Sequence, residues 1–90
     1  MEQFIAEKHK VLIPVTEHNI HVLYNPKCLP ITGFTKDGIV VTKDNEDVFI
    51  TYGEIQEEYF ICSEDPYGSE DDNNSAFQTY CEYRDKALKM

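Results

Sequence analysis

The feature that most constrains the fold is a series of short apolar runs between residues 10 and 63, each separated from the next by turn residues. One of these separators is Lys36-Asp37-Gly38, a hairpin signal in which glycine is expected to supply the positive φ of a tight turn. Short runs that alternate apolar and polar residues are typical of antiparallel strands. The sequence therefore predicts strands at residues 10–15, 20–24, 31–35, 39–42, 48–52 and 59–63.

The last two predicted strands are joined by a segment that resembles the end of an SH3-like small barrel. Gly53 is followed by residues 54–58, which suit a single helical turn, and then by the last apolar run. We therefore expect an α+β fold, mostly β: a small antiparallel meander or SH3-like barrel of five to six strands with one C-terminal helix. An open antiparallel sheet is the alternative.

The C-terminal helix is predicted from a capping signal and an apolar stripe. Ser75-Ala-Phe-Gln78 matches a capping box, in which the two polar side chains satisfy free amides of the first turn. We expect the helix from about 76 to 88, after an acidic loop at 64–74, in a single domain over residues 1–90 whose sheet spans about 10–63. The stripe expected to cover the sheet is Phe77, Tyr80, Cys81, Arg84 and Leu88.

Charge is distributed unevenly along the chain. The formal net charge is −9, and residues 44–83 contain twelve acidic residues and no Lys or Arg. Direct binding to DNA, RNA or an anionic membrane is disfavoured, because those surfaces attract clustered Lys and Arg. Like charges at this density repel one another, whereas ordinary surfaces mix both signs. The pattern therefore favours a partner protein with a basic groove.

The residues predicted to bind this partner are carboxylates with tyrosines between them, since tyrosine is enriched at binding hot spots. They are Glu54, Glu57, Glu58, Tyr59, Asp65, Tyr67, Glu70, Asp71 and Asp72. Carboxylates on one side of an extended strand recur about every 6.6 Å, close to the spacing of phosphates along one strand of nucleic acid. The sequence thus predicts a mimic of the phosphate backbone.

In size and charge, the whole chain is similar to phage-encoded antagonists of host nucleic-acid enzymes, such as anti-CRISPR and anti-restriction proteins. This likeness of composition implies a non-enzymatic inhibitor that occupies the basic groove of a nucleic-acid-binding enzyme or complex. Two alternatives stay open. One is an accessory protein-interaction module that docks through an apolar barrel or helix surface, and the other is a barrel that binds a small ligand.

Signals for catalysis and for metal binding are weak, so we predict no enzyme, no catalytic residue, no metal and no cofactor. No Gly-x-Ser-x-Gly, phosphate-binding glycine loop or Cys-His-Asn grouping occurs. His18 and His21 lie in a predicted turn and strand, where we expect exposed imidazoles that diverge, and residues 65–72 lack the spacing of a calcium loop. The three cysteines include no Cys-x-x-Cys pair, and we expect reduced thiols, with Cys62 and Cys81 buried.

The expected location follows from the apolar pattern and the N-terminal charges. The first residues carry acids where a signal peptide would carry basic residues. No apolar run approaches the roughly 18 residues needed to span a membrane. We therefore expect a cytoplasmic protein, in the host cytoplasm if the source is viral, and leave its oligomeric state open.

Overall fold

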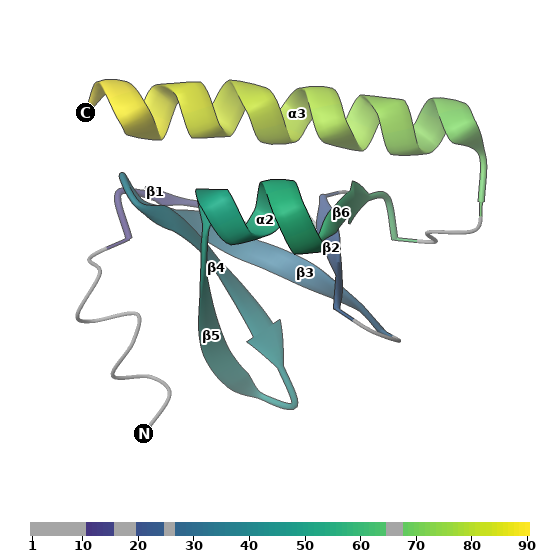
Figure 1. The fold of residues 1–90 in the computed structure, drawn as a ribbon, viewed down its shortest axis with the longest axis horizontal. Helices are drawn as coiled ribbons and strands as arrows, with labels where there is room; N and C mark the ends of the chain where they lie inside the picture. Colours follow the sequence, from purple (N-terminus) through teal and green to yellow (C-terminus); the bar gives the residue numbers. More distant parts are fainter. Residues whose placement is uncertain (1–10, 16–19, 25–26, 65–67) are drawn as a thin grey trace.

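The fold is a six-stranded antiparallel sheet with a long C-terminal helix across it (Figure 1). The computed structural model describes residues 11–15, 20–24, 27–64 and 68–90. The expected α+β class, a small antiparallel sheet followed by a C-terminal helix, is confirmed. The elements are β1 (Ile13–Pro14), β2 (His21–Tyr24), β3 (Lys27–Phe34), β4 (Gly38–Lys43), β5 (Glu46–Thr51), α2 (Tyr52–Glu58), β6 (Phe60–Cys62) and α3 (Glu70–Lys89).

The sheet order places the last strand, β6, beside β2. The order is β5-β4-β3-β2-β6, with β1 also paired to β3, and these ladders are antiparallel. β1 and β2 lie along the same edge of β3, since Ile13 pairs with Phe34 and His21 pairs with Pro30. β6 pairs with the other side of β2, which is the return expected at the end of an SH3-like small barrel. Within the described residues no ladder joins β5 to β6, so the sheet is open between these two strands.

The hairpin turn before β4 forms where it was predicted, but the reason given for its glycine was wrong. Gly38 does not have a positive φ. A Cβ at this position would instead collide with the backbone carbonyl oxygen of Ile50 in the neighbouring strand. The turn is held by the Thr35 hydroxyl, which accepts hydrogen bonds from the amides of Asp37 and Gly38 at 3.0 Å each. The close approach of β5 therefore requires the glycine.

The C-terminal helix begins earlier than predicted. α3 starts at Glu70, and its N-cap is Ser69, whose hydroxyl accepts a hydrogen bond from the amide of Asp71 at 3.2 Å. The predicted cap at Ser75 and the predicted start near residue 76 are wrong, because residues 70–74 of the expected acidic loop are helical. Acidic residues in the first turn complement the positive end of the helix dipole. The acids that precede Ser75 therefore favour the earlier of two serines that could each cap the helix.

The face of α3 that packs on the sheet also differs from the predicted stripe. Phe77 and Leu88, both in that stripe, are 52% and 53% exposed. The ring centre of Tyr80 lies 5.7 Å from that of Phe34 in β3, and the small alanines on either side of Tyr80 let the helix approach the sheet. The buried residues of α3 are Ala76, Tyr80 and Ala87. The helix is thus rotated about its axis, and part of the apolar stripe faces solvent.

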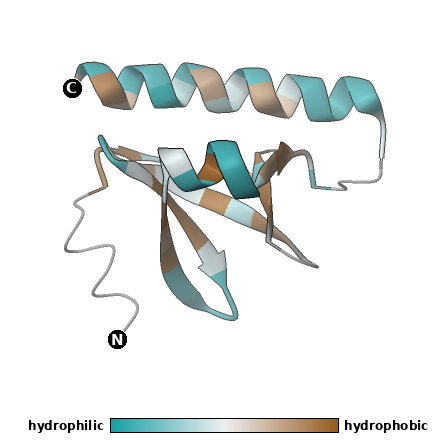
Figure 2. Ribbon diagram, viewed as in Figure 1, coloured by the Kyte–Doolittle hydropathy of each residue, from teal (hydrophilic) through white to brown (hydrophobic). Residues whose placement is uncertain are grey.

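The core fills the space between the sheet and α3. Most of its fully buried side chains are β-branched and come from the strands, together with Phe34. β4 is buried on both faces from Gly38 to Val41, which agrees with its continuous apolar run. Figure 2 shows the contrast between these apolar strands and the hydrophilic β4–β5 turn. The sheet therefore provides a rigid base on which the two helices are placed.

Candidate functional site

The first candidate surface is one side of α2, which carries three of the predicted carboxylates. The segment forms a seven-residue helix rather than a single turn, because the Thr51 hydroxyl caps it by accepting a hydrogen bond from the amide of Glu54 at 3.2 Å. Successive helical residues are about 100° apart around the axis. Glu54, Glu57 and Glu58 consequently share one side of α2, and all three are exposed.

The second candidate surface is the first turn of α3. Glu70, Asp71 and Asp72 directly follow the N-cap and are all exposed. Because consecutive residues are about 100° apart, these carboxylates point to three different sides of the helix. The acids of α2 and α3 lie on helices, so the prediction that they are spaced along an extended strand is wrong. The structure gathers three acids on one side of α2 and spreads the other three around α3.

Among the described residues, the charges of these two surfaces have no local counter-charge. None of the six carboxylates forms an ion pair within the part of the chain that the structure describes. Glu54 accepts a hydrogen bond from the Thr51 hydroxyl at 3.0 Å, which holds its carboxylate at the start of α2. Asp65 and Tyr67, which were predicted to belong to the same surface, lie outside the described residues. The described acids are therefore available to an external partner.

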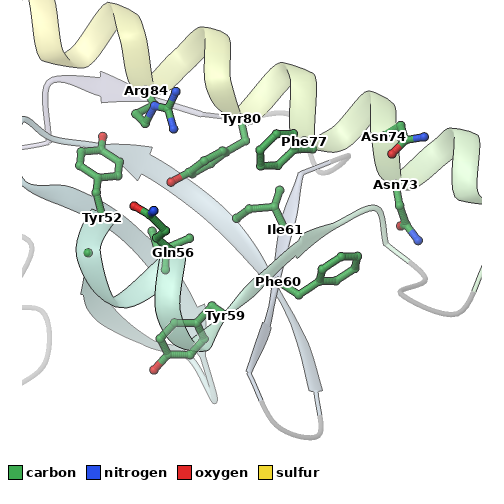
Figure 3. Close-up of a pocket in the computed structure, with 12 residues that line it drawn as sticks. Tyr52, Gln56, Tyr59, Phe60, Ile61, Asn73, Asn74, Phe77, Tyr80 and Arg84 are labelled. Carbon is green, nitrogen blue, oxygen red and sulfur yellow. The ribbon is translucent and has the colours of Figure 1, made fainter.

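Tyr59, the remaining predicted residue, belongs to a cleft that the sequence did not reveal (Figure 3). The cleft has a volume of about 640 Å³ and lies between α2, β6 and α3. In the cleft wall, Phe60 and Phe77 are 50% and 52% exposed, whereas Tyr80, in the middle of α3, is buried. The aromatic residues of its wall are Tyr52, Tyr59, Phe60, Phe77 and Tyr80. Half-exposed phenylalanines make the cleft an apolar surface open to solvent.

Polar side chains enter the cleft from both helices. Gln56 comes from α2, and Asn73, Asn74 and Arg84 come from α3. The side-chain oxygen of Asn73 accepts hydrogen bonds from the amide and the hydroxyl of Ser63, at 2.9 Å and 3.0 Å. These bonds tie α3 to the chain just after β6, so one end of the cleft is held in place by the backbone.

Arg84 supplies the charge of the cleft. It is the one charged residue among the described residues that line the cleft, and 35% of its side chain is exposed. Its guanidinium carbon lies 5.7 Å from the centre of the Tyr80 ring. Burial raises the pKa of Tyr80 to about 12, and burial also raises the pKa of Tyr52 above its usual range. The phenols carry no charge at physiological pH, so the cleft takes its positive charge from Arg84.

The chemistry of the cleft is that of a binding site. Its volume lies in the range of about 300–1,000 Å³ that is usual for ligand pockets, which combine apolar walls with a few polar groups. Among the described lining residues there is no carboxylate, histidine or cysteine that could pair as nucleophile and base. Phe77, Tyr80 and Arg84 were recognised in the sequence as part of one stripe, but this stripe was expected to cover the sheet. The exposed fraction of each of these side chains depends on how α3 packs against α2 and β6, which helical spacing alone does not specify.

The cysteines form a contact that sequence spacing did not predict. The Sγ atoms of Cys28 in β3 and Cys62 in β6 are 2.8 Å apart, and Cys28 Sγ also lies 3.2 Å from the carbonyl oxygen of Ser63. No disulfide bond joins any of the three cysteines. Cys62 is buried as expected, but Cys81 is only half-buried. None of the three lines the cleft.

The histidine prediction is partly outside the described residues. His18 is not among them, and His21 is buried in β2 with 6% exposure, so the expectation that it is solvent-exposed was wrong. In the described segments, no three His, Cys, Asp or Glu side chains come together in a way that could hold a metal ion. Neither described helix is both long and apolar enough to cross a membrane.

Comparison with known proteins adds no functional assignment to this geometry. The chain matches no protein-family model, no curated protein and no solved structure. The fold and the site together define a small α+β domain with an acidic surface on two helices and an aromatic cleft between them. Its function must therefore be argued from these residues.

Proposed function

We propose that the protein is a non-enzymatic acidic binding protein that inhibits a nucleic-acid-handling protein by occupying its basic groove, as phage-type antagonists such as anti-CRISPR and anti-restriction proteins do. The observation that carries the proposal is the set of exposed carboxylates on α2 and α3 that have no ion pair within the described residues. A groove lined by Lys and Arg supplies the counter-charges, and its field accelerates association with a surface of opposite sign.

The spacing of the acids on α2 supports this proposal. Glu54 and Glu58 are four residues apart, which corresponds to about 6 Å along a helix axis. Charges along one strand of nucleic acid fall about every 3.4 Å, so a groove that contacts alternate phosphates presents cations at a similar interval. α2 thus takes the place of the extended strand that the sequence had led us to expect.

Charge reversal on α2 tests the proposal directly. The protein is first used to capture its partner from host lysate at low and high salt, with the captured protein identified by mass spectrometry. The double variant Glu57→Lys/Glu58→Lys should bind that partner at least ten-fold more weakly, and duplex DNA should compete with the wild-type protein. The matched control is Glu46→Lys/Asp47→Lys in β5, which makes the same charge change away from both helices and should have a smaller effect.

The same experiment can reject the proposal. A partner that binds DNA and this protein simultaneously, with an affinity that salt does not change, would contradict occupation of a basic groove. That outcome would instead favour an accessory module that docks through apolar contacts, since such contacts are not screened by salt. Equal loss of affinity in the two double variants would show that net charge matters but that α2 is not the contact surface.

A further inference from the structure

We propose that the cleft between α2, β6 and α3 binds a small planar aromatic monocarboxylate. The ring of this ligand packs on the exposed faces of Phe60 and Phe77, and its carboxylate pairs with Arg84 (Figure 3). Phe77 and Arg84 are seven residues apart on α3, about 10 Å along the helix axis. A bicyclic aromatic acid spans this separation when the long arginine side chain reaches toward it.

The first argument concerns the aromatic rings. The ring of Phe34 lies in the core, the ring of Tyr80 is centred 5.7 Å from it, and the ring of Phe77 is centred 6.0 Å from that of Tyr80. Aromatic pairs favour centroid separations of 4.5–7 Å, so these three rings form a continuous series that leads from the core to the cleft. The series ends at Phe77, which is 52% exposed. A ligand ring would extend it by one member and remove that apolar surface from water.

The second argument concerns the charge of Arg84. A guanidinium presents two parallel N–H donors that match the two oxygens of a carboxylate. Its ion pair with the adjacent Asp85 consists of one contact at 3.5 Å, and the Asp85 side chain is 58% exposed, so this pair is weak. A carboxylate inside the aromatic walls is less screened than Asp85 and forms a stronger pair.

The third argument restricts the charge of the ligand. A cation in the cleft would be repelled by Arg84, the one charge among the described lining residues. A dianion such as a phosphate monoester would be repelled by the rest of the protein, whose formal net charge is −9. A ligand with a single negative charge is attracted by the arginine and is repelled less by the surrounding acids than a dianion is. Gln56 and Asn74, whose side chains line the same cleft, can form hydrogen bonds with polar substituents on the ring.

This site is separate from the acidic surface of the proposed function. None of the six predicted carboxylates that the structure describes is among the residues that line the cleft. On α2, Tyr52 and Gln56 line the cleft, and the helical period places Glu54, Glu57 and Glu58 on the other side. Binding of a ligand and binding of a basic partner can therefore be lost independently by substitution.

The test compares three probes that share one ring system. 2-Naphthoate, uncharged 2-naphthamide and cationic 2-naphthylmethylammonium are titrated into the full-length protein, with binding followed by naphthalene fluorescence and by ¹H–¹⁵N chemical shifts. We expect saturable 1:1 binding of 2-naphthoate, with the largest shifts at residues that line the cleft. 2-Naphthamide should bind at least ten-fold more weakly, and the cation more weakly still.

Substitutions then assign each part of the site. Phe77→Ala should weaken both naphthoate and naphthamide at least ten-fold, because both need the ring contact. Arg84→Gln should abolish the preference for naphthoate over naphthamide. Its matched control, Lys86→Gln, removes a positive charge that lies over the Tyr83 ring outside the cleft, and should keep that preference.

Four outcomes would overturn the proposal. Equal affinity for the three probes would show a general apolar surface, and shifts centred outside the cleft would show a different site. An unchanged preference in a folded Arg84→Gln variant would remove the role of the arginine. A pentapeptide that ends in phenylalanine and binds at least ten-fold more tightly than 2-naphthoate would show that the cleft receives a chain terminus rather than a small ligand.

Discussion

The exposed and buried aromatic residues of α3 make a direct test of how this helix packs. Tyr80→Ala and Phe77→Ala each remove one aromatic side chain from the same helix, three residues apart, and each introduces the same helix-favouring residue. Tyr80 is 3% exposed and Phe77 is 52% exposed. The difference between the two variants therefore reports packing, because the change in helix propensity is nearly the same in both.

The expected magnitudes follow from these exposures. Removal of a buried aromatic side chain costs about 3–5 kcal/mol, which includes the cavity that remains, and Tyr80 also loses its ring contact with Phe34 at 5.7 Å. Full burial of a phenylalanine side chain is worth about 1.5–3 kcal/mol. A half-exposed phenylalanine contributes about half of that free energy, and its replacement by alanine regains a few tenths of a kcal/mol through the higher helix propensity of alanine. Phe77→Ala should therefore cost about 1 kcal/mol or less.

Thermal and urea unfolding, followed by circular dichroism, measure both variants. Each 1 kcal/mol lowers the Tm of a domain of this size by about 4–8 °C, so Tyr80→Ala should lower it by more than about 10 °C. Phe77→Ala should lower it by no more than about 8 °C. Equal losses in the two variants, or a larger loss for Phe77→Ala, would mean that the stripe read from the sequence is the packed face and that the cleft is closed in solution.

Three further predictions concern the turn, the phenols and the thiols. Gly38→Ala should cost about 1–3 kcal/mol in urea unfolding, because its Cβ meets the backbone of Ile50, whereas Gly53→Ala, with no atom within 4 Å of the added Cβ, should be neutral or stabilising. Burial raises the pKa of Tyr80 to about 12 from about 10 in the unfolded chain, so the contribution of the neutral phenol to stability is complete below pH 10 and is lost as the pH rises to 12. Tyr80→Phe should flatten that part of the stability–pH curve, and an unchanged slope would contradict the burial of the phenol. Half-buried Cys81 should react with Ellman's reagent before fully buried Cys62, and labelling of Cys62 in Cys81→Ser at the rate of the unfolded chain would contradict its burial.

Features that depend on neighbours along the chain could be predicted from the sequence. Alternation of apolar residues and turn residues located most of the strands, because a period of two and a tight turn are properties of a few consecutive residues. The start of β3 was predicted wrongly, since this strand begins at Lys27 and not at residue 31. The double burial of β4 also followed from one uninterrupted apolar run, from Gly38 to Val41. The acids of α2 could be recognised as exposed because burial of an unpaired carboxylate is costly. Local signals were less decisive for the start of α3, since both Ser69 and Ser75 suit an N-cap and the choice depends on whether the acids between them join the helix.

Features that depend on segments far apart in the chain were decided only by the tertiary structure. Helical spacing identifies an apolar arc on α3, but that arc is wide enough to include both Phe77 and Ala76. Packing against the sheet buries the side with the small alanines. The contact between Cys28 and Cys62 joins residues 34 positions apart. The cleft likewise requires residues 52–61 and 73–84 to converge. Each of these segments is compatible with several packings by itself, and the lowest free energy belongs to the one that buries Tyr80 against Phe34 and leaves Phe77 half-exposed in the cleft.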